Sequence, residues 1–224
     1  MSEPAATALE RDGDVFVLRL QAGENRFAPG TLDELEAALG EVEGREGPKA
    51  LVTTGEGKYF SNGLDVDHMS ADPEGMVSYL ARVDAVFARL LSLSCPTVAA
   101  VNGHAFGAGA MLALSHDLSV MRSDRGWWCL PEVDLAMYFP PGMNALCTAR
   151  LPVRTAHEAM VTGRRYTGPD ALASGIVDAL ADEETLLGDV VARAAALAPK
   201  AGPSIARIRT TLHAEAIAHL TGSA

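Results

Sequence analysis

The segment PTVAAVNGHAFGAGAML at residues 96–112 constrains the fold of this chain more than any other. An apolar strand leads into a glycine-rich turn, and an alanine-rich helix starts directly after it. A helix that begins after such a turn presents free backbone N–H groups at the positive end of its dipole. Downstream, the stretch LPEVDL at 130–135 places a single carboxylate, Glu132, between apolar residues. A lone acid near such donors indicates proton abstraction beside a polarised carbonyl.

Length and charge narrow the possible classes of protein. The chain has 224 residues, enough for one domain with a substantial core. The formal net charge of -11 argues against a nucleic-acid partner or an anionic membrane, because both need a basic surface. We find no apolar run of membrane-spanning length and no secretory signal pattern, and we therefore expect a cytoplasmic protein.

Cysteine and histidine spacing does not indicate a metal site. None of the histidines follows a known ligand pattern, and the cysteines lack metal-type spacing. We expect Cys95, Cys129 and Cys147 to be buried thiols.

Strand and helix patterns alternate along most of the chain, which predicts a layered α/β fold. In the helix expected at 31–43, Thr31 is placed to cap the first turn, with Glu34 at the capping-box position. The strands are expected at 15–20, 49–54, 97–101 and 118–121, and the other helices at 76–93, 108–115, 155–163, 169–174, 183–197 and 203–220, with a short extended piece at 176–179.

A second glycine-rich loop, at 55–67, also follows a strand. Ligands in layered α/β folds bind outside the carboxyl ends of the strands, so both loops should open on the same edge. Two backbone N–H groups from two loops can then converge on one oxygen and form an oxyanion hole, in which each donor contributes about 3 kcal/mol. The alternative is that Gly63, Gly103, Gly107 and Gly109 only permit tight turns and close packing.

Three motifs in order, FSNGLD at 60–65, AVNGHAFGAG at 100–109 and PEVDL at 131–135, resemble the crotonase, or enoyl-CoA hydratase/isomerase, superfamily. The resemblance covers roughly residues 12–180, and residues 115–137 are most similar to plant-type and peroxisomal-type Δ3,Δ2-enoyl-CoA isomerases. It implies a spiral of ββα units at 1–150 and a helical oligomerisation region at 151–224, in one continuous domain. It also implies a homotrimer or a dimer of trimers.

The resemblance further implies an acyl-CoA thioester substrate, with no separate cofactor. The backbone amides of Leu64 and Ala108 would hold the thioester oxygen, and Glu132 would shuttle the proton. Hydratases of this family carry a further acid at the position of Met111, which cannot act as an acid or base. A single acid favours double-bond migration over hydration. Two alternatives remain: another enzyme on the same fold, such as a hydratase, a hydrolase or a decarboxylase, and a non-catalytic protein that binds acyl-CoA.

Further residues are candidates for binding the ligand, and an acidic chain needs local cations to hold the CoA phosphates. Arg26 and Lys58 are candidates for binding the CoA phosphates, and the alternative for each is a solvated charge on the surface. The remaining candidates for ligand binding are Ser61, Asn62, Gly63 and Gly107. The helix at 76–93 and residues 138–141 would enclose the acyl chain, unless the helix stripe is ordinary core.

Glu132 is alternatively a solvated acid, but its apolar neighbours indicate burial, which would raise its pKa. Asp134 lies one step off the motif position, and we expect it to bond local amides rather than to act as the base. We also expect structural roles for Asp65, Asp117 and the turn histidine His104.

Overall fold

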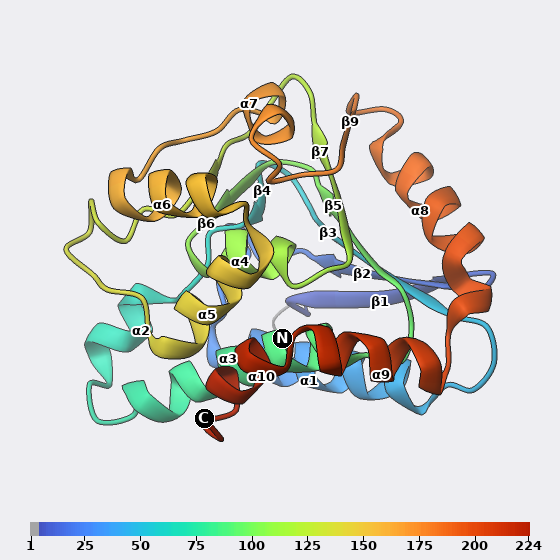
Figure 1. The fold of residues 1–224 in the computed structure, drawn as a ribbon, viewed down its shortest axis with the longest axis horizontal. Helices are drawn as coiled ribbons and strands as arrows, with labels where there is room; N and C mark the ends of the chain where they lie inside the picture. The colour runs from blue at the N-terminus through green and yellow to red at the C-terminus, as the bar shows by residue number, and fades with distance from the viewer. Residues whose placement is uncertain (1–4) are drawn as a thin grey trace.

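The computed structural model describes residues 5–224, which form two sheets wrapped by helices (Figure 1). The larger sheet has the strand order β1-β2-β3-β5-β7-β9, and the smaller has the order β4-β6-β8. Neighbouring strands are parallel except for the β1–β2 hairpin. The strands are β1 (Thr7–Asp12), β2 (Val15–Leu20), β3 (Ala50–Gly55), β4 (Tyr59–Ser61), β5 (Thr97–Val101), β6 (His104–Phe106), β7 (Leu118–Arg122), β8 (Trp128–Cys129) and β9 (Ala179–Ala181).

Each turn of the chain places one strand in each sheet. Strands β3, β5 and β7 lie in the larger sheet, and the strand that follows each of them lies in the smaller one. Helices return the chain to the start of the larger sheet after β4 and β6, and this repetition confirms the predicted spiral of ββα units. The helices are α1 (Pro29–Gly44), α2 (Val66–Ala71), α3 (Met76–Ser92), α4 (Ala108–Leu114), α5 (Pro141–Arg150), α6 (Val153–Thr162), α7 (Gly168–Ala173), α8 (Leu186–Leu197), α9 (Pro203–Leu212) and α10 (Ala214–Leu220), with a 3-10 turn at Ala198–Lys200.

Both faces of the larger sheet are covered, which explains why its central strands are apolar throughout. Alternate residues of β2 separate the two faces: Val15 and Val17 pack with α8, whereas Phe16 and Leu18 join the larger core. Figure 1 shows α8 alone on one side of the sheet and the other long helices on the opposite side. All three cysteines are buried in this interior, as predicted.

The start of α1 corrects the predicted cap. The helix begins at Pro29, which has no N–H to satisfy, and Ala28 occupies the cap position without a side-chain hydrogen bond. Thr31 is therefore buried inside the first turn and does not cap it. The Glu34 carboxylate instead accepts hydrogen bonds from the backbone N–H groups of Ala6 (3.2 Å) and Thr7 (2.6 Å).

The end of the chain also differs from the prediction. A single helix was expected at 203–220, but the chain turns at His213 and forms α9 and α10. The turn lets Ala216 and Leu220 of α10 bury their side chains in the main core. The short extended piece lies slightly later than expected, at Ala179–Ala181, where it pairs with β7.

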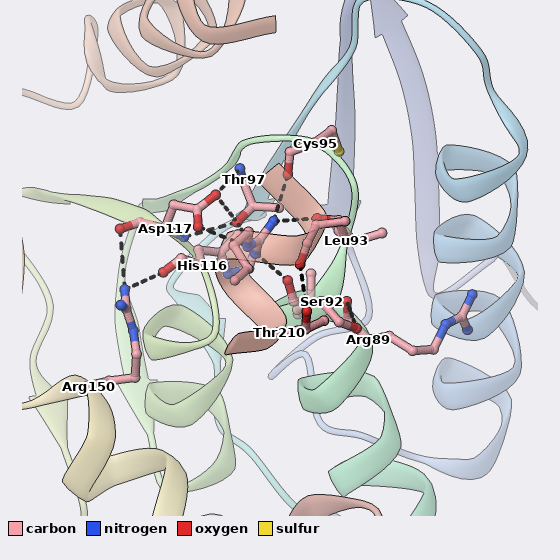
Figure 2. A network of polar contacts seen from close by, with 12 residues as sticks. Arg89, Ser92, Leu93, Cys95, Thr97, His116, Asp117, Arg150 and Thr210 are labelled. Carbon is pink, nitrogen blue, oxygen red and sulfur yellow. Dashed lines mark hydrogen bonds and ion pairs between the residues drawn. The ribbon is translucent and has the colours of Figure 1, made fainter. Parts of the chain in front are cut away.

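A buried polar network joins the last helices to the sheet (Figure 2). The guanidinium of Arg209, on α9, donates to the carbonyl oxygens of Leu93 (3.0 Å) and Cys95 (2.7 Å) and forms a 3.1 Å ion pair with Asp117. Asp117 also accepts a hydrogen bond from the backbone N–H of Thr97 (2.8 Å), at the first residue of β5. The predicted structural role of Asp117 is thereby confirmed.

No helix within residues 5–224 is both long and apolar enough to cross a bilayer. In the same part of the chain, no group of three or more histidine, cysteine or acidic side chains is placed to hold a metal ion.

Candidate active site

The two glycine-rich turns pack backbone against backbone. Gly63 and Gly107 have φ values of 81° and 52°, in the left-handed region that favours glycine. A Cβ atom on Gly63 would lie 2.7 Å from the carbonyl oxygen of Phe106 and 2.9 Å from the amide nitrogen of Ala108. A Cβ atom on Gly109 would overlap the carbonyl oxygen of Ser61. Side chains at these positions would therefore force the two turns apart.

Two backbone donors are left free where the turns meet. Leu64 follows Gly63, and Ala108 is the first residue of α4. Neither amide has a hydrogen-bond acceptor among the described residues of the chain. Both residues line the same cavity, so the structure brings together the two amides that the sequence predicted.

This cavity, which we call the acyl cavity, has a volume of about 590 Å³. Most of its lining is apolar, and methionines contribute from four separate positions. Glu132 is the single acid among the described lining residues. The lining consists of Arg26, Tyr59, Asn62, Leu64, Val66, Met69, Met76, Leu80, Phe106, Gly107, Ala108, Pro131, Glu132, Leu135, Ala136, Met137, Tyr138, Pro140 and Met143.

Glu132 lies in a turn that follows β8, and its residue is only 9% exposed. Its Oε2 atom is buried and has no hydrogen-bond partner within residues 5–224. Burial raises the pKa of Glu132 to about 7, and an upward shift of this pKa was predicted from the sequence. A Cβ atom on Gly107 would stand 3.3 Å from its Oε1 atom, so the carboxyl lies directly beside the second glycine turn.

The predicted second-acid position contributes no polar atom to the cavity. Met111 is completely buried in the core and is not part of the cavity lining. The described part of the chain thus offers one carboxyl for chemistry in this cavity, that of Glu132.

The predicted CoA-binding residues separate into two groups. Arg26 and Asn62 line the acyl cavity, but the Arg26 guanidinium is already paired with Glu24 (2.8 Å) and Asp67 (3.2 Å). Lys58 lies instead in a second, neighbouring cavity.

Ser61 does not line the acyl cavity either. It is fully buried, and its hydroxyl donates to the carbonyl oxygen of Asn25 (2.7 Å) and accepts from the N–H of Gly63 (3.1 Å). Ser61 therefore shapes the turn, and its backbone packs closely against Gly109.

The other predicted polar residues have structural contacts. Asp65 caps α2 by accepting from the N–H of His68, and His104 Nδ1 accepts from the backbone N–H of Trp127. Asp134 is exposed and does not line the cavity. We expected its carboxylate to accept hydrogen bonds from local amides, but it accepts none within residues 5–224. Its Oδ2 atom lies beside Gly163 instead.

Helix α3 and residues 138–141 border the cavity in part as predicted. Met76 and Leu80 of α3, together with Tyr138 and Pro140, line it, whereas Phe139 packs on the core. The sequence interpretation missed Tyr59, Val66 and Met69, because 55–67 was expected to be an irregular loop and not β4 followed by α2. It also missed Met143, whose burial follows from the unexpected α5.

The spiral of ββα units, the paired glycine turns and the acid beside them together define an α/β protein with one mostly apolar candidate active site. Residues 10–222 match the enoyl-CoA hydratase/isomerase family, and the chain belongs to that family. It is 36% identical over 218 residues to enoyl-CoA delta isomerase 3 of Arabidopsis thaliana, with 92% of each chain covered. It is 37% identical over 220 residues to the peroxisomal enoyl-CoA delta isomerase 2 of the same plant, again with 92% of each covered.

Solved structures agree with this assignment. An apo structure of an enoyl-CoA isomerase from Mycobacterium tuberculosis superposes with a TM-score of 0.89 at 25% identity, covering 98% of this chain and 96% of that chain.

Proposed function

We propose that the protein is a Δ3,Δ2-enoyl-CoA isomerase and that Glu132 is its proton shuttle. One observation carries the proposal: a single buried carboxyl, with a pKa raised to about 7, faces the acyl cavity beside two free backbone amides. At neutral pH such a group is present in both protonation states, which suits a residue that must accept a proton and return it. The names of the plant relatives support the same reaction.

The proposed reaction needs one base and one oxyanion site. The Glu132 carboxylate takes a proton from C2 of a 3-enoyl thioester, and the electron pair of that C–H bond forms a dienolate. The N–H groups of Leu64 and Ala108 donate to the dienolate oxygen and form the oxyanion hole. The Glu132 carboxyl then returns the proton at C4, which gives the 2-enoyl thioester and restores the carboxylate. The reaction consumes no cofactor.

Hydration would need a second polar group to position water and deliver a proton. Met111 occupies the position that would supply this group, and it is buried in the core. The lining of the acyl cavity favours an apolar chain as substrate, and its four methionines, with their flexible side chains, suit acyl groups of different shapes.

Assembly and location remain predictions from the sequence. For a homotrimer, the supporting observation is that Ile208 and Leu212 expose their side chains on α9, in the region expected to mediate oligomerisation. A cytoplasmic location stays a prediction, although some relatives are named as peroxisomal proteins.

The decisive experiment compares the wild-type protein with Glu132→Gln. The amide keeps the shape of the side chain but cannot accept the proton, so we expect turnover of 3-enoyl-CoA to fall by about a hundredfold or more while acyl-CoA binding persists. The same preparation of wild-type protein should not hydrate 2-enoyl-CoA. Wild-type rates in the Glu132→Gln variant would show that another residue is the base, and efficient hydration of 2-enoyl-CoA would identify a hydratase.

A further inference from the structure

Asn25 lies on the loop that follows β2 and is 1% exposed, with its backbone in the left-handed region at a φ of 54°. Glycine enters this region at no steric cost, and asparagine enters it more readily than most other residues that have a Cβ atom. A glycine would therefore satisfy the backbone at this position. Asparagine adds only its side-chain amide, so the contacts of that amide determine what the residue contributes.

The side-chain amide of Asn25 connects its own loop to β4. Its Oδ1 atom accepts a hydrogen bond from the N–H of Ala22 (2.9 Å), and its Nδ2 atom donates to the carbonyl oxygens of Tyr59 (3.0 Å) and Phe60 (3.2 Å). The register of β4 against β6 shifts between Tyr59 and Ser61, as in a β-bulge. Such a shift disrupts the hydrogen-bond ladder locally. The amide therefore fixes β4 at the point where the strand passes into the first glycine turn.

The backbone of the same loop holds the first glycine turn itself. The carbonyl oxygen of Asn25 accepts from the hydroxyl of Ser61 (2.7 Å), and the Ser61 Oγ atom accepts in turn from the N–H of Gly63 (3.1 Å). Two residues further along the loop, the N–H of Phe27 donates to the carbonyl oxygen of Gly63 (2.9 Å). Both backbone polar groups of Gly63 are thus held, directly or through Ser61, by the loop that carries Asn25.

Leu64 has a free N–H between two that are bound. The N–H of Gly63 donates to Ser61, and the N–H of Asp65 donates to the hydroxyl of Tyr79 on α3 (2.8 Å). Both acceptor hydroxyls belong to buried residues. The N–H of Leu64 has no acceptor among the described residues, and Leu64 lines the acyl cavity. The direction of this N–H is therefore set by the bonds of its neighbours and not by a bond of its own.

We propose that Asn25 is a positioning residue for the oxyanion hole: it sets the turn that directs the Leu64 N–H at the thioester oxygen. This role rests on the proposed function, in which that N–H stabilises the dienolate. Asn25 does not line the acyl cavity, so it acts through Ser61 and Gly63 and not by contact with the substrate. A displacement of about 1 Å in a site can lower a rate on the order of a hundredfold, even when every reacting group is present.

Two variants interrupt this chain of contacts at different points. Asn25→Gly keeps the left-handed backbone accessible and removes the side-chain amide. Ser61→Ala removes the hydroxyl that joins the Asn25 carbonyl oxygen to the Gly63 N–H, with a small change in volume. The matched control is Ser115→Ala. Ser115 is equally buried, but its hydroxyl donates to the carbonyl oxygen of Met111 at the end of α4 (2.9 Å) and not to the turn.

Steady-state kinetics with 3-enoyl-CoA, normalised to the folded protein by circular dichroism, test the positioning role. We expect kcat to fall about tenfold to a hundredfold in Asn25→Gly and in Ser61→Ala, because the oxyanion donor is displaced. KM should change by less than about threefold, since neither residue lines the acyl cavity. Ser115→Ala should keep the kcat and KM of the wild type. Wild-type kcat in Asn25→Gly, or in Ser61→Ala where Asn25→Gly does not fold, would overturn the proposal, and so would an equal loss in Ser115→Ala.

Infrared spectroscopy of a bound product gives a readout that needs no turnover. The probe is a 2-enoyl-CoA that is isotopically labelled at the thioester carbonyl carbon. Hydrogen bonds to the carbonyl oxygen polarise the C=O bond and lower its stretching frequency, so we expect the wild type to lower this frequency on binding. Asn25→Gly and Ser61→Ala should lower it less, and Ser115→Ala should match the wild type.

The two measurements separate the role of Asn25 from the proposed function. A wild type that lowers the carbonyl frequency but does not isomerise 3-enoyl-CoA would refute the isomerase and leave the infrared test of Asn25 intact. A frequency shift of wild-type size in both folded variants would show that Asn25 supports only the fold. No shift in the wild type would refute the oxyanion hole and, with it, the role of Asn25.

Discussion

At the scale of single residues, the environment of Glu132 determines which chemistry the acyl cavity can support. Its Oε2 atom is buried without a partner in the described chain, and no cation lies close enough to lower its pKa. Desolvation is therefore the largest influence on the pKa of Glu132 and outweighs a backbone hydrogen bond that lowers it. A buried acid without a partner usually destabilises the folded state. Its position beside two free backbone amides suits a catalytic role, which accounts for this cost in stability.

The raised pKa of Glu132 predicts a specific pH dependence. Only the carboxylate can accept the C2 proton, so kcat/KM for 3-enoyl-CoA should rise from pH 5 through a midpoint near pH 7, where Glu132 is half ionised, and level off above about pH 8. Steady-state rates across this range measure the midpoint. A profile that is flat between pH 5 and pH 8 would be incompatible with Glu132 as the base.

The same residues show which parts of the site could be predicted from sequence patterns. The two glycine turns and the lone acid Glu132 were visible as local patterns, whereas the amides of Leu64 and Ala108 were assigned through the family resemblance of those turns. Ser61 lies in the first motif and Lys58 just before it, but neither lines the acyl cavity: Ser61 packs against Gly109, and Lys58 lies over the ring of Tyr59. Such tertiary contacts leave no periodic signal in the sequence.

At the scale of elements, periodicity predicted the long segments and missed the short ones. Helix α3 and strands β2, β3 and β5 have enough residues to show their pattern, whereas β4, β6 and β8 have at most three residues each. Helix α5 begins at Pro141, the second of two consecutive prolines, which favour a stiff loop when taken alone. The smaller sheet and α5 both border the acyl cavity, so the missed elements are those that complete the site.

Helices α3, α5 and α10 meet around a second buried acid, Asp84. Its Oδ1 atom has no partner among residues 5–224, and burial raises its pKa to about 7. A Cβ atom on Gly142 of α5 would lie 2.9 Å from both Asp84 Oδ2 and the Cα atom of Leu220. The three helices therefore pack so tightly at this point that the carboxyl has no access to a compensating charge.

Replacing Asp84 with asparagine should stabilise the protein at alkaline pH. The folded state retains a proton that the unfolded chain releases near its ordinary pKa of 3.8, so stability falls as pH rises from about 4 to about 7. The penalty is on the order of 1.4 kcal/mol for each unit by which the pKa is raised, and Asp84→Asn should regain a few kcal/mol at pH 8. Urea denaturation at pH 8 and at pH 4 measures the difference.

At pH 4 the variant and the wild type should unfold at similar urea concentrations, since both are then uncharged at this position. The exposed Asp12→Asn, on β1, is the matched control and should change stability little at either pH. A loss of stability in Asp84→Asn at pH 8 would show that the carboxylate has a favourable partner in the folded state.

At the scale of the whole molecule, the last two helices are held to the core by a few specific contacts. Helix α10 contributes Ala216 and Leu220 to the main core, and α9 is fixed by one buried arginine, Arg209. That arginine donates to the carbonyl oxygens of Leu93 and Cys95, which lie between α3 and β5. It also forms an ion pair with Asp117, which directly precedes β7. Because α10 packs against α3 and α5, which line the acyl cavity, this anchor also supports the site.

Arg209→Ala should therefore weaken the whole fold and not only the end of the chain. Removing the guanidinium takes the ion-pair partner from Asp117 and the donor from the buried carbonyl oxygens of Leu93 and Cys95, an arrangement that costs about 3–5 kcal/mol. Arg207→Ala is the matched control, because it removes the same charge from an exposed position on the same helix and should cost less than about 0.5 kcal/mol. Urea denaturation followed by far-UV circular dichroism measures both, and KM for 3-enoyl-CoA reports on the cavity. Equal stability of the two variants would mean that α9 is attached by its apolar face alone, and that the contacts of Arg209 contribute little to holding the last helices on the core.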